Sequence, residues 1–103
     1  MDKVFSMVGL ATRAGKTVAG EFSVEKAVKE GKAQLVIVSE EASENTKKLF
    51  TNKCAYYKIP IFIYGSKKAL GSFTGNMERA SIAVLDKGFS KSIINLLDSK
   101  KRR

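Results

Sequence analysis

Two segments of the chain combine side chains whose chemistry suits binding to nucleic acid. The first is a cluster of four basic residues around two glycine-bounded elements: Lys16, Lys26, Lys29 and Lys32. Ammonium groups bind phosphates, and a helix that begins near residues 20–22 would add free backbone N–H groups. The second segment, Gly75 to Arg79, brings together an amide, a flexible apolar side chain and a guanidinium, which can stack on an extruded base and hold its backbone. Each segment alone is also typical of an ordinary connection.

Arrangements that could support catalysis are poor by comparison. The segment Arg13 to Thr17 resembles the end of a phosphate-binding P-loop, but leucine stands where the upstream glycine is required, and a strand follows instead of a helix. Glu40 and Glu41 follow a predicted strand, and we interpret them as solvated loop charges because nothing would hold a substrate between them. The absence of histidine leaves Cys54 without an activating base and excludes zinc sites built from cysteine and histidine clusters. We therefore expect no enzyme, no metal site and no cofactor.

The overall composition favours a polyanion as the partner. The length of 103 residues fits one domain, and 44% hydrophobic residues are enough for a core. Nineteen lysines and arginines against ten acidic residues give a formal charge of +9, which attracts nucleic acid, although a basic balance can also serve solubility alone. The sequence has neither an apolar run of membrane-spanning length nor the pattern of a signal peptide, and its single cysteine suits a reducing compartment. We expect a cytoplasmic protein without a membrane partner.

Apolar runs and turn residues predict the elements that hold these segments. Helices are expected at residues 2–14, 22–30, 43–58, 66–70 and 90–99. Extended segments are expected at residues 17–19, 35–38, 61–64 and 81–85, of which the second and third are typical of buried strands. Strands that alternate with helices predict an α/β fold, a three-layer α/β/α sandwich with a small central mixed sheet. We expect one RNA-binding domain over residues 1–99 and a basic tail over residues 100–103.

The order of these features is similar to that of a known family. The matching segments are Gly15 to Gly20, Lys26 to Ala33 and Leu35 to Val38, followed by Leu70, Gly71, Gly75, Arg79 and Ile82 to Val84. In this order they resemble the large-subunit ribosomal proteins called L-seven-Ae and L-thirty-e, and most closely the small bacterial YlxQ-type members. No single motif is decisive, but the ordered set covers nearly the whole chain.

The resemblance implies an α/β/α sandwich that binds kink-turns or related bent internal loops of RNA. In the family, the loop from the first strand into the second helix enters the RNA groove beside sheared G·A pairs, and the loop before the last strand shields an extruded base. On this chain these surfaces contain Gly20, Glu21, Phe22, Ser23, Lys26, Asn76, Met77 and Arg79, and Lys16 joins them from the basic cluster. The expected partner is structured RNA, with ribosomal RNA among the candidates, bound by a monomer that has no small-molecule substrate.

Phe22 and Ser23 depart from the pattern of the family. Many kink-turn binders carry a polar pair there, asparagine–glutamate or lysine–glutamine, whose side chains read guanine edges. A bidentate base contact is worth ~1–3 kcal/mol, so its loss can remove kink-turn preference while phosphate binding survives. Phe22 can equally be a core residue on its helix face.

Two other functions are alternatives to an RNA-binding module. The first is a protein-interaction module on the same fold, and the second is a small α/β/α enzyme.

Overall fold

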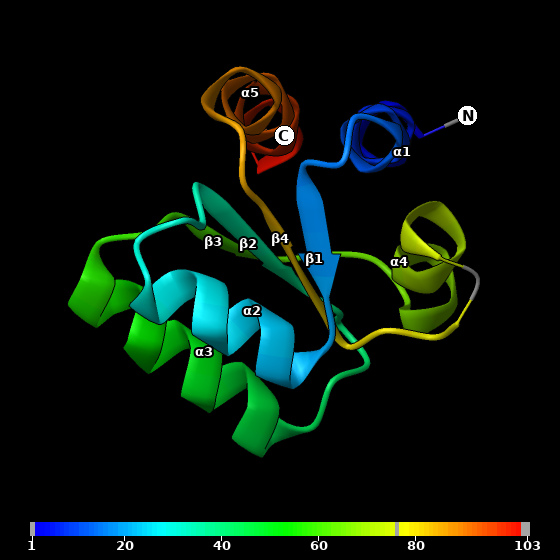
Figure 1. The fold of residues 1–103 in the computed structure, drawn as a ribbon. Coiled ribbons are helices and arrows are strands. Elements are labelled where there is room, and N and C mark those ends of the chain that lie inside the picture. Colours follow the sequence, from blue (N-terminus) through cyan, green and yellow to red (C-terminus); the bar gives the residue numbers. More distant parts are fainter. Residues whose placement is uncertain (1, 76, 102–103) are drawn as a thin grey trace.

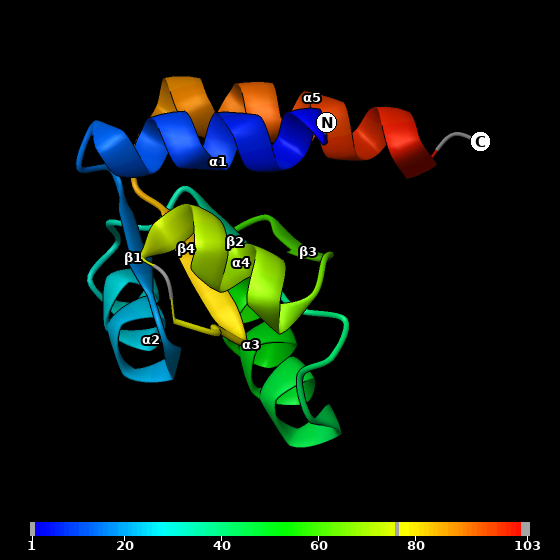
Figure 2. The ribbon, with the colours of Figure 1, turned by 90° about the vertical axis from the view of Figure 1, so that its right-hand side faces the viewer.

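The polypeptide folds into a small β-sheet enclosed between two layers of helices (Figure 1). The computed structural model of the chain describes residues 2–75 and 77–101. Their elements are, in chain order, α1 (Lys3–Arg13), β1 (Thr17–Ala19), α2 (Glu21–Lys29), β2 (Leu35–Val38), α3 (Glu44–Tyr57), β3 (Ile61–Ile63), α4 (Lys67–Thr74), β4 (Ser81–Val84) and α5 (Lys87–Lys101). Helices α2 and α3 cover one face of the sheet, while α1, α4 and α5 lie on the other face (Figure 2). The predicted three-layer α/β/α sandwich is confirmed.

The sheet has the strand order β1-β4-β2-β3. Strand β4 pairs antiparallel with both β1 and β2, whereas β2 and β3 are parallel, so the sheet is mixed as expected. The two central strands, β2 and β4, are buried along their whole length. The third strand was predicted to be buried, and this is wrong: β3 is only partly buried, and Ile63 exposes 43% of its surface because the strand pairs on one edge alone.

Each face of the sheet has its own hydrophobic core, supplied by alternate residues of the central strands. Leu35 and Ile37 pack with α1, α4 and α5, while Val36 and Val38 pack with α2 and α3. This two-residue period explains why the sequence of β2 is continuously apolar. Cys54 of α3 is buried in the second core, and this burial raises the pKa of its thiol to about 11. The interpretation of Cys54 as a small buried hydrophobe is confirmed.

Three predicted helix boundaries lie two or more residues from the observed ones. The short fourth helix was expected to end before Gly71, but α4 continues to Thr74, and Gly71 serves close packing instead of termination. Helix α5 begins before the predicted position because Asp86 Oδ2 accepts a hydrogen bond of 2.9 Å from the backbone N–H of Phe89. The same helix continues through Lys101, so the first two residues of the predicted basic tail are helical, and residues 102–103 lie outside the described residues.

One corner of the fold joins the start of α1 to the end of β3. Asp2 caps α1 by accepting hydrogen bonds from the backbone N–H groups of Val4 and Phe5, at 2.8 and 3.4 Å. The hydroxyl of Tyr64 donates to the other carboxylate oxygen of Asp2, and the ammonium group of Lys100 lies 5.8 Å from the centre of the Tyr64 ring. Burial acts to raise the pKa of Asp2, but these hydrogen bonds and the charge of Lys100 outweigh it and lower the pKa below 3.8.

The free energy of unfolding should therefore decrease on acidification in a way that depends on Asp2. A carboxylate whose pKa is lowered by folding stabilises the fold above its unfolded pKa, and this contribution is lost as the pH falls through the folded value. Asp2→Asn keeps a capping oxygen but does not titrate. We expect urea unfolding, carried out at neutral pH and below about pH 4, to show this. The free energy of unfolding should decrease more between the two conditions for the wild type than for Asp2→Asn. Equal losses would contradict this role of Asp2.

Candidate nucleic-acid interface

The junction between β1 and α2 presents open backbone N–H groups at the surface. Gly20 has a φ of 94°, donates its N–H to Ser81 O at 3.0 Å and leads directly into the helix. No side chain caps α2, and none of the described residues accepts a hydrogen bond from the N–H groups of residues 21–23. Free amides and the helix dipole together attract an anion to this point.

The guanidinium of Arg79 lies beside the same helix terminus. Its Nη1 atom is 3.2 Å from the position that a Cβ atom on Gly20 would occupy. Within the described residues Arg79 forms no salt bridge, and its buried Nε atom has no hydrogen-bond partner. A cation and the positive end of a helix dipole repel each other unless an anion lies between or beside them. The junction is therefore chemically suited to a phosphate.

Close packing against α4 holds the loop that carries Arg79. A Cβ atom on the buried Gly71 would lie 1.7 Å from the carbonyl oxygen of Met77 and 2.9 Å from the Cα atom of Glu78. Only glycine allows this approach, and the backbone N–H of Arg79 then donates to Lys67 O at 3.1 Å. The side chain of Met77 points outward and exposes 65% of its surface. Helix α4 thus fixes the backbone from which Met77 and Arg79 extend.

A groove continues from this junction along α2. It has a volume of about 300 Å³ and lies between α2 and the edge strand β1, lined by Val18, Phe22, Ser23, Lys26, Ala27, Glu30, Lys32 and Leu85. Phe22 exposes 79% of its surface, so of the two alternatives that the sequence left open, the position in the core is excluded. Val24, Ala27 and Val28 are the residues of α2 that face the core. The exposed ring is free to contact a ligand beside Lys26.

Comparison with known proteins identifies the family of the chain. A profile of the Ribosomal protein L7Ae/L30e/S12e/Gadd45 family matches residues 2–94. The chain belongs to this family. It is 45% identical over 94 residues to the RNA-binding protein YlxQ of Bacillus subtilis, a match that covers 91% of this chain and 94% of that protein. It is 30% identical to the large ribosomal subunit protein eL8 of Thermoplasma volcanium, with coverage of 98% and 88%.

A solved structure shares the fold of this chain. The structure of a protein with unknown function from Bacillus halodurans superposes with a TM-score of 0.91 and 42% sequence identity, covering 95% of this chain and 99% of that one. Membership of the L7Ae/L30e family and the likeness to YlxQ were both expected from the ordered set of segments, and both are confirmed. The three-layer fold is thus shared with a close relative along nearly its whole length.

The structure brings most of the predicted site residues together. Gly20, Glu21, Phe22 and Ser23 form the junction with Arg79, and Lys26 follows one helical turn after Phe22. Lys16 lies apart from the junction, at the opposite end of β1, where its carbonyl accepts a hydrogen bond from Leu85 N. At ~3.3 Å per strand residue, it is about 13 Å from Gly20. Asn76 lies outside the described residues. The predicted contacts of all these residues with RNA stay predictions.

Gly71 shapes the interface but was not predicted as part of it, and Lys32 was predicted only as one residue of the basic cluster. Gly71 was interpreted as a helix stop, since its actual role depends on a loop that returns from later in the chain. Lys32 belonged to the basic cluster, but only the course of the groove places it on the same surface as Phe22. A glycine within an amphipathic helix was the one signal that could have indicated a close backbone approach.

The neighbouring acidic residues Glu40 and Glu41 make hydrogen bonds that stabilise the fold. Glu40 accepts a hydrogen bond of 3.0 Å from Gly65 N, and Glu41 accepts one of 2.9 Å from Lys67 N at the start of α4. They therefore connect two loops and the first turn of a helix. Over residues 2–75 and 77–101, no group of histidine, cysteine, aspartate and glutamate side chains is arranged to hold a metal ion. In the same residues, no helix has the length and apolar character needed to cross a membrane.

Proposed function

We propose that this protein is a non-catalytic, monomeric RNA-binding protein that recognises sharply bent structured RNA, such as a kink-turn, and associates with ribosomal RNA. The observation that carries the proposal is the guanidinium of Arg79, which has no partner among the described residues and lies beside the uncapped start of α2. The names of two relatives, an RNA-binding protein and a large-subunit ribosomal protein, support it. The formal charge of +9 gives the chain a general attraction for RNA.

The proposed contacts divide into two kinds. The N–H groups at the start of α2, the guanidinium of Arg79 and the ammonium of Lys26 would hold phosphates on both sides of a bend. The exposed side chains of Phe22 and Met77 would contact bases that the bend has removed from their stack. Because straight duplex RNA offers neither unstacked bases nor converging phosphates, this division makes the protein selective for shape.

Phe22 also defines how the bend would be read. Its ring has no hydrogen-bonding atoms, so guanine edges in the groove are not read at this position by polar contacts. The exposed ring offers stacking and apolar area instead. We infer that recognition here depends on phosphate geometry and stacking more than on base identity.

Titration of a kink-turn RNA against a straight duplex of equal length, at two salt concentrations, tests the proposal. We expect preference for the kink-turn of about tenfold or more, because the stacking contacts to unstacked bases are absent in the duplex. The preference should persist at the higher salt concentration, since stacking releases no counterions, while both affinities fall.

A kink-turn RNA whose bulge has been filled by complementary nucleotides is the matched control, and it should bind like the duplex. Equal affinity for kink-turn and duplex would contradict recognition of a bend. Failure to bind any of these RNAs would contradict RNA binding itself and would favour a protein-interaction module.

A further inference from the structure

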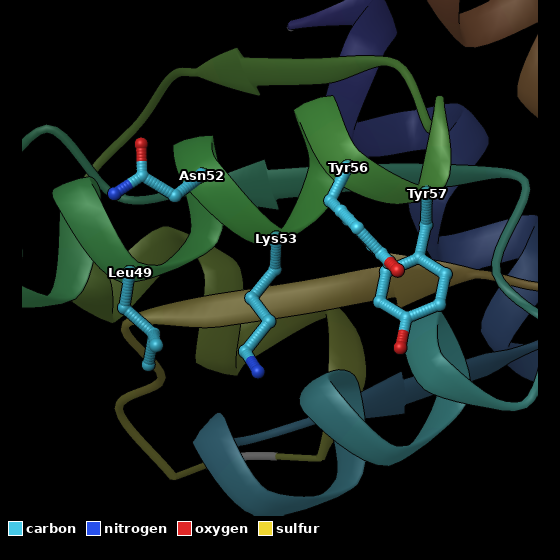
Figure 3. A pocket seen from close by; sticks show the side chains of 5 residues that line it. All are labelled: Leu49, Asn52, Lys53, Tyr56 and Tyr57. Carbon is cyan, nitrogen blue, oxygen red and sulfur yellow. The ribbon is translucent and has the colours of Figure 1, made fainter.

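A pair of tyrosines on α3 forms an exposed aromatic surface away from the junction. Tyr56 exposes 79% of its surface and Tyr57 exposes 38%. Their ring centres are 4.8 Å apart, and the rings are nearly perpendicular, with an angle of 77° between their planes. Together with Leu49, Asn52 and Lys53 they line a hollow of about 470 Å³ (Figure 3). We call these five residues the α3 surface.

The fold itself does not require an aromatic side chain at Tyr56. Helix α3 packs on the sheet through Phe50 and Cys54, which are both buried. Tyr56 lies outside that face, and within the described residues neither tyrosine hydroxyl makes a hydrogen bond to the protein. Large exposed aromatic side chains are characteristic of contact surfaces, because burial on binding recovers the free energy that exposure to water costs.

The charge around the α3 surface favours an anionic occupant. Helix α3 contains one acidic residue, Glu44, whereas Lys47, Lys48 and Lys53 lie on it and Lys58 follows it. The ammonium groups of Lys29 and Lys53 share the single carboxylate of Glu25, at 3.5 and 3.4 Å. Two cations on one anion leave a net positive charge beside the rings. Basic groups interleaved with exposed aromatics are the pattern of surfaces that bind single-stranded nucleic acid.

The α3 surface is also connected to the proposed RNA interface. Helices α2 and α3 lie side by side on the same face of the sheet (Figure 1). The ion pair between Glu25 and Lys53 joins them, and the outer side of α2 carries a second hollow of about 250 Å³, lined by Phe22, Glu25, Lys26, Lys29 and Glu30. An RNA strand that leaves the start of α2 thus meets basic and aromatic side chains along its path toward Tyr56.

We propose that the α3 surface binds an unpaired RNA segment that continues from the structured element held at α2, with a base stacked on Tyr56 beside Tyr57. This inference rests on the proposed function. In it, Tyr56 presents a ring face to a base, Tyr57 forms the side of the hollow, and the lysines contact the phosphates between successive bases. Stacking tolerates any base, so the surface extends the bound length of RNA without selecting its sequence.

The test compares a blunt kink-turn RNA with the same RNA bearing a short unpaired extension, placed at either end in separate molecules. One of the two extensions should increase the affinity of the wild-type protein. Tyr56→Ala should remove about tenfold of affinity for that RNA, since one stacked base is lost, and leave the blunt RNA unchanged. Tyr56→Phe keeps the ring and should retain the gain. Because Tyr56 is exposed, both variants should fold like the wild type.

The outcomes separate this inference from the proposed function. If the blunt RNA binds and neither extension adds affinity, the inference is overturned while the proposed function stands. An extension that helps Tyr56→Ala as much as the wild type would place the unpaired segment elsewhere and leave the aromatic pair to a protein partner. Absence of binding to every RNA would remove both. As a second readout, a photoreactive 4-thiouridine in the extension should crosslink to a peptide that contains Tyr56 or Tyr57.

Discussion

Replacing Gly71 by alanine is expected to lower both the stability of the fold and its affinity for RNA. The added Cβ atom would lie 1.7 Å from Met77 O, 2.4 Å from the Met77 carbonyl carbon and 2.9 Å from the Cα atom of Glu78. All three are backbone atoms, so no side-chain rotation can relieve the overlap. Forcing extra volume into such a contact costs about 1–3 kcal/mol. The loop or α4 must move, and movement of the loop displaces Arg79 from the start of α2.

Urea unfolding and titration with kink-turn RNA measure the two effects separately. We expect destabilisation of about 1–3 kcal/mol and an affinity reduced by roughly tenfold. Ser72→Ala is the matched control, because Ser72 is the next residue of the same helix and is exposed. It should change neither quantity. If Gly71→Ala retained wild-type stability and affinity, the close approach of the loop to α4 would not be what holds the interface.

Replacing Arg79 by methionine is expected to separate stability from binding. Methionine preserves much of the apolar packing of the arginine stem. Among the described residues, the guanidinium that it removes forms no ion pair, and its buried Nε atom has no hydrogen-bond acceptor. The free energy of unfolding should therefore stay equal or rise. RNA affinity should fall by roughly 10- to 100-fold, which corresponds to a hydrogen-bonded charge contact of about 1.5–3 kcal/mol.

The salt dependence of binding identifies the cause of the loss. The slope of log affinity against log salt concentration should decrease in magnitude by about one for Arg79→Met, because one phosphate contact is removed. Arg13→Met removes the same charge from an exposed position at the end of α1, near the far end of β1. Its affinity should stay close to that of the wild type. Similar losses for both variants would indicate that only total charge matters.

The architecture could be predicted from the sequence because its strongest signals are local. The apolar residues of β2 show burial on both faces directly, and alternation of strands with helices then leads to the layered fold. Errors arose where neighbours in space decide. The apolar residues of β3 do not reveal that this strand stands at an edge, and an apolar Phe22 does not reveal that its helix turns it to solvent.

The candidate site was less predictable, because its contacts join distant parts of the chain. The antiparallel register that places Ala19 opposite Ile82 brings Gly20 to Arg79, and nothing in either segment alone indicates the other. The family resemblance implied only that both loops contact the same RNA. The open helix terminus was expected from residues 20–22 themselves, whereas the guanidinium of Arg79, which has no partner among the described residues, depends on the absence of particular neighbours in the fold. The exposure of Tyr56 and Tyr57 on α3 could not be predicted either, because exposure is a property of the folded surface.

Cys54 makes local opening of the α3 layer measurable through the reaction of its thiol with a reagent. It is the only cysteine, only 1% of its surface is exposed, and burial raises the pKa of its thiol to about 11. A thiol reagent in solution has no access to it while α3 rests on the sheet, and the thiolate that would react is scarce at neutral pH. The rate of modification of Cys54 therefore reports local opening of this layer, in the unaltered protein and without an attached dye. The same rate, followed with and without RNA, reports how strongly a ligand on α2 and α3 holds that layer closed.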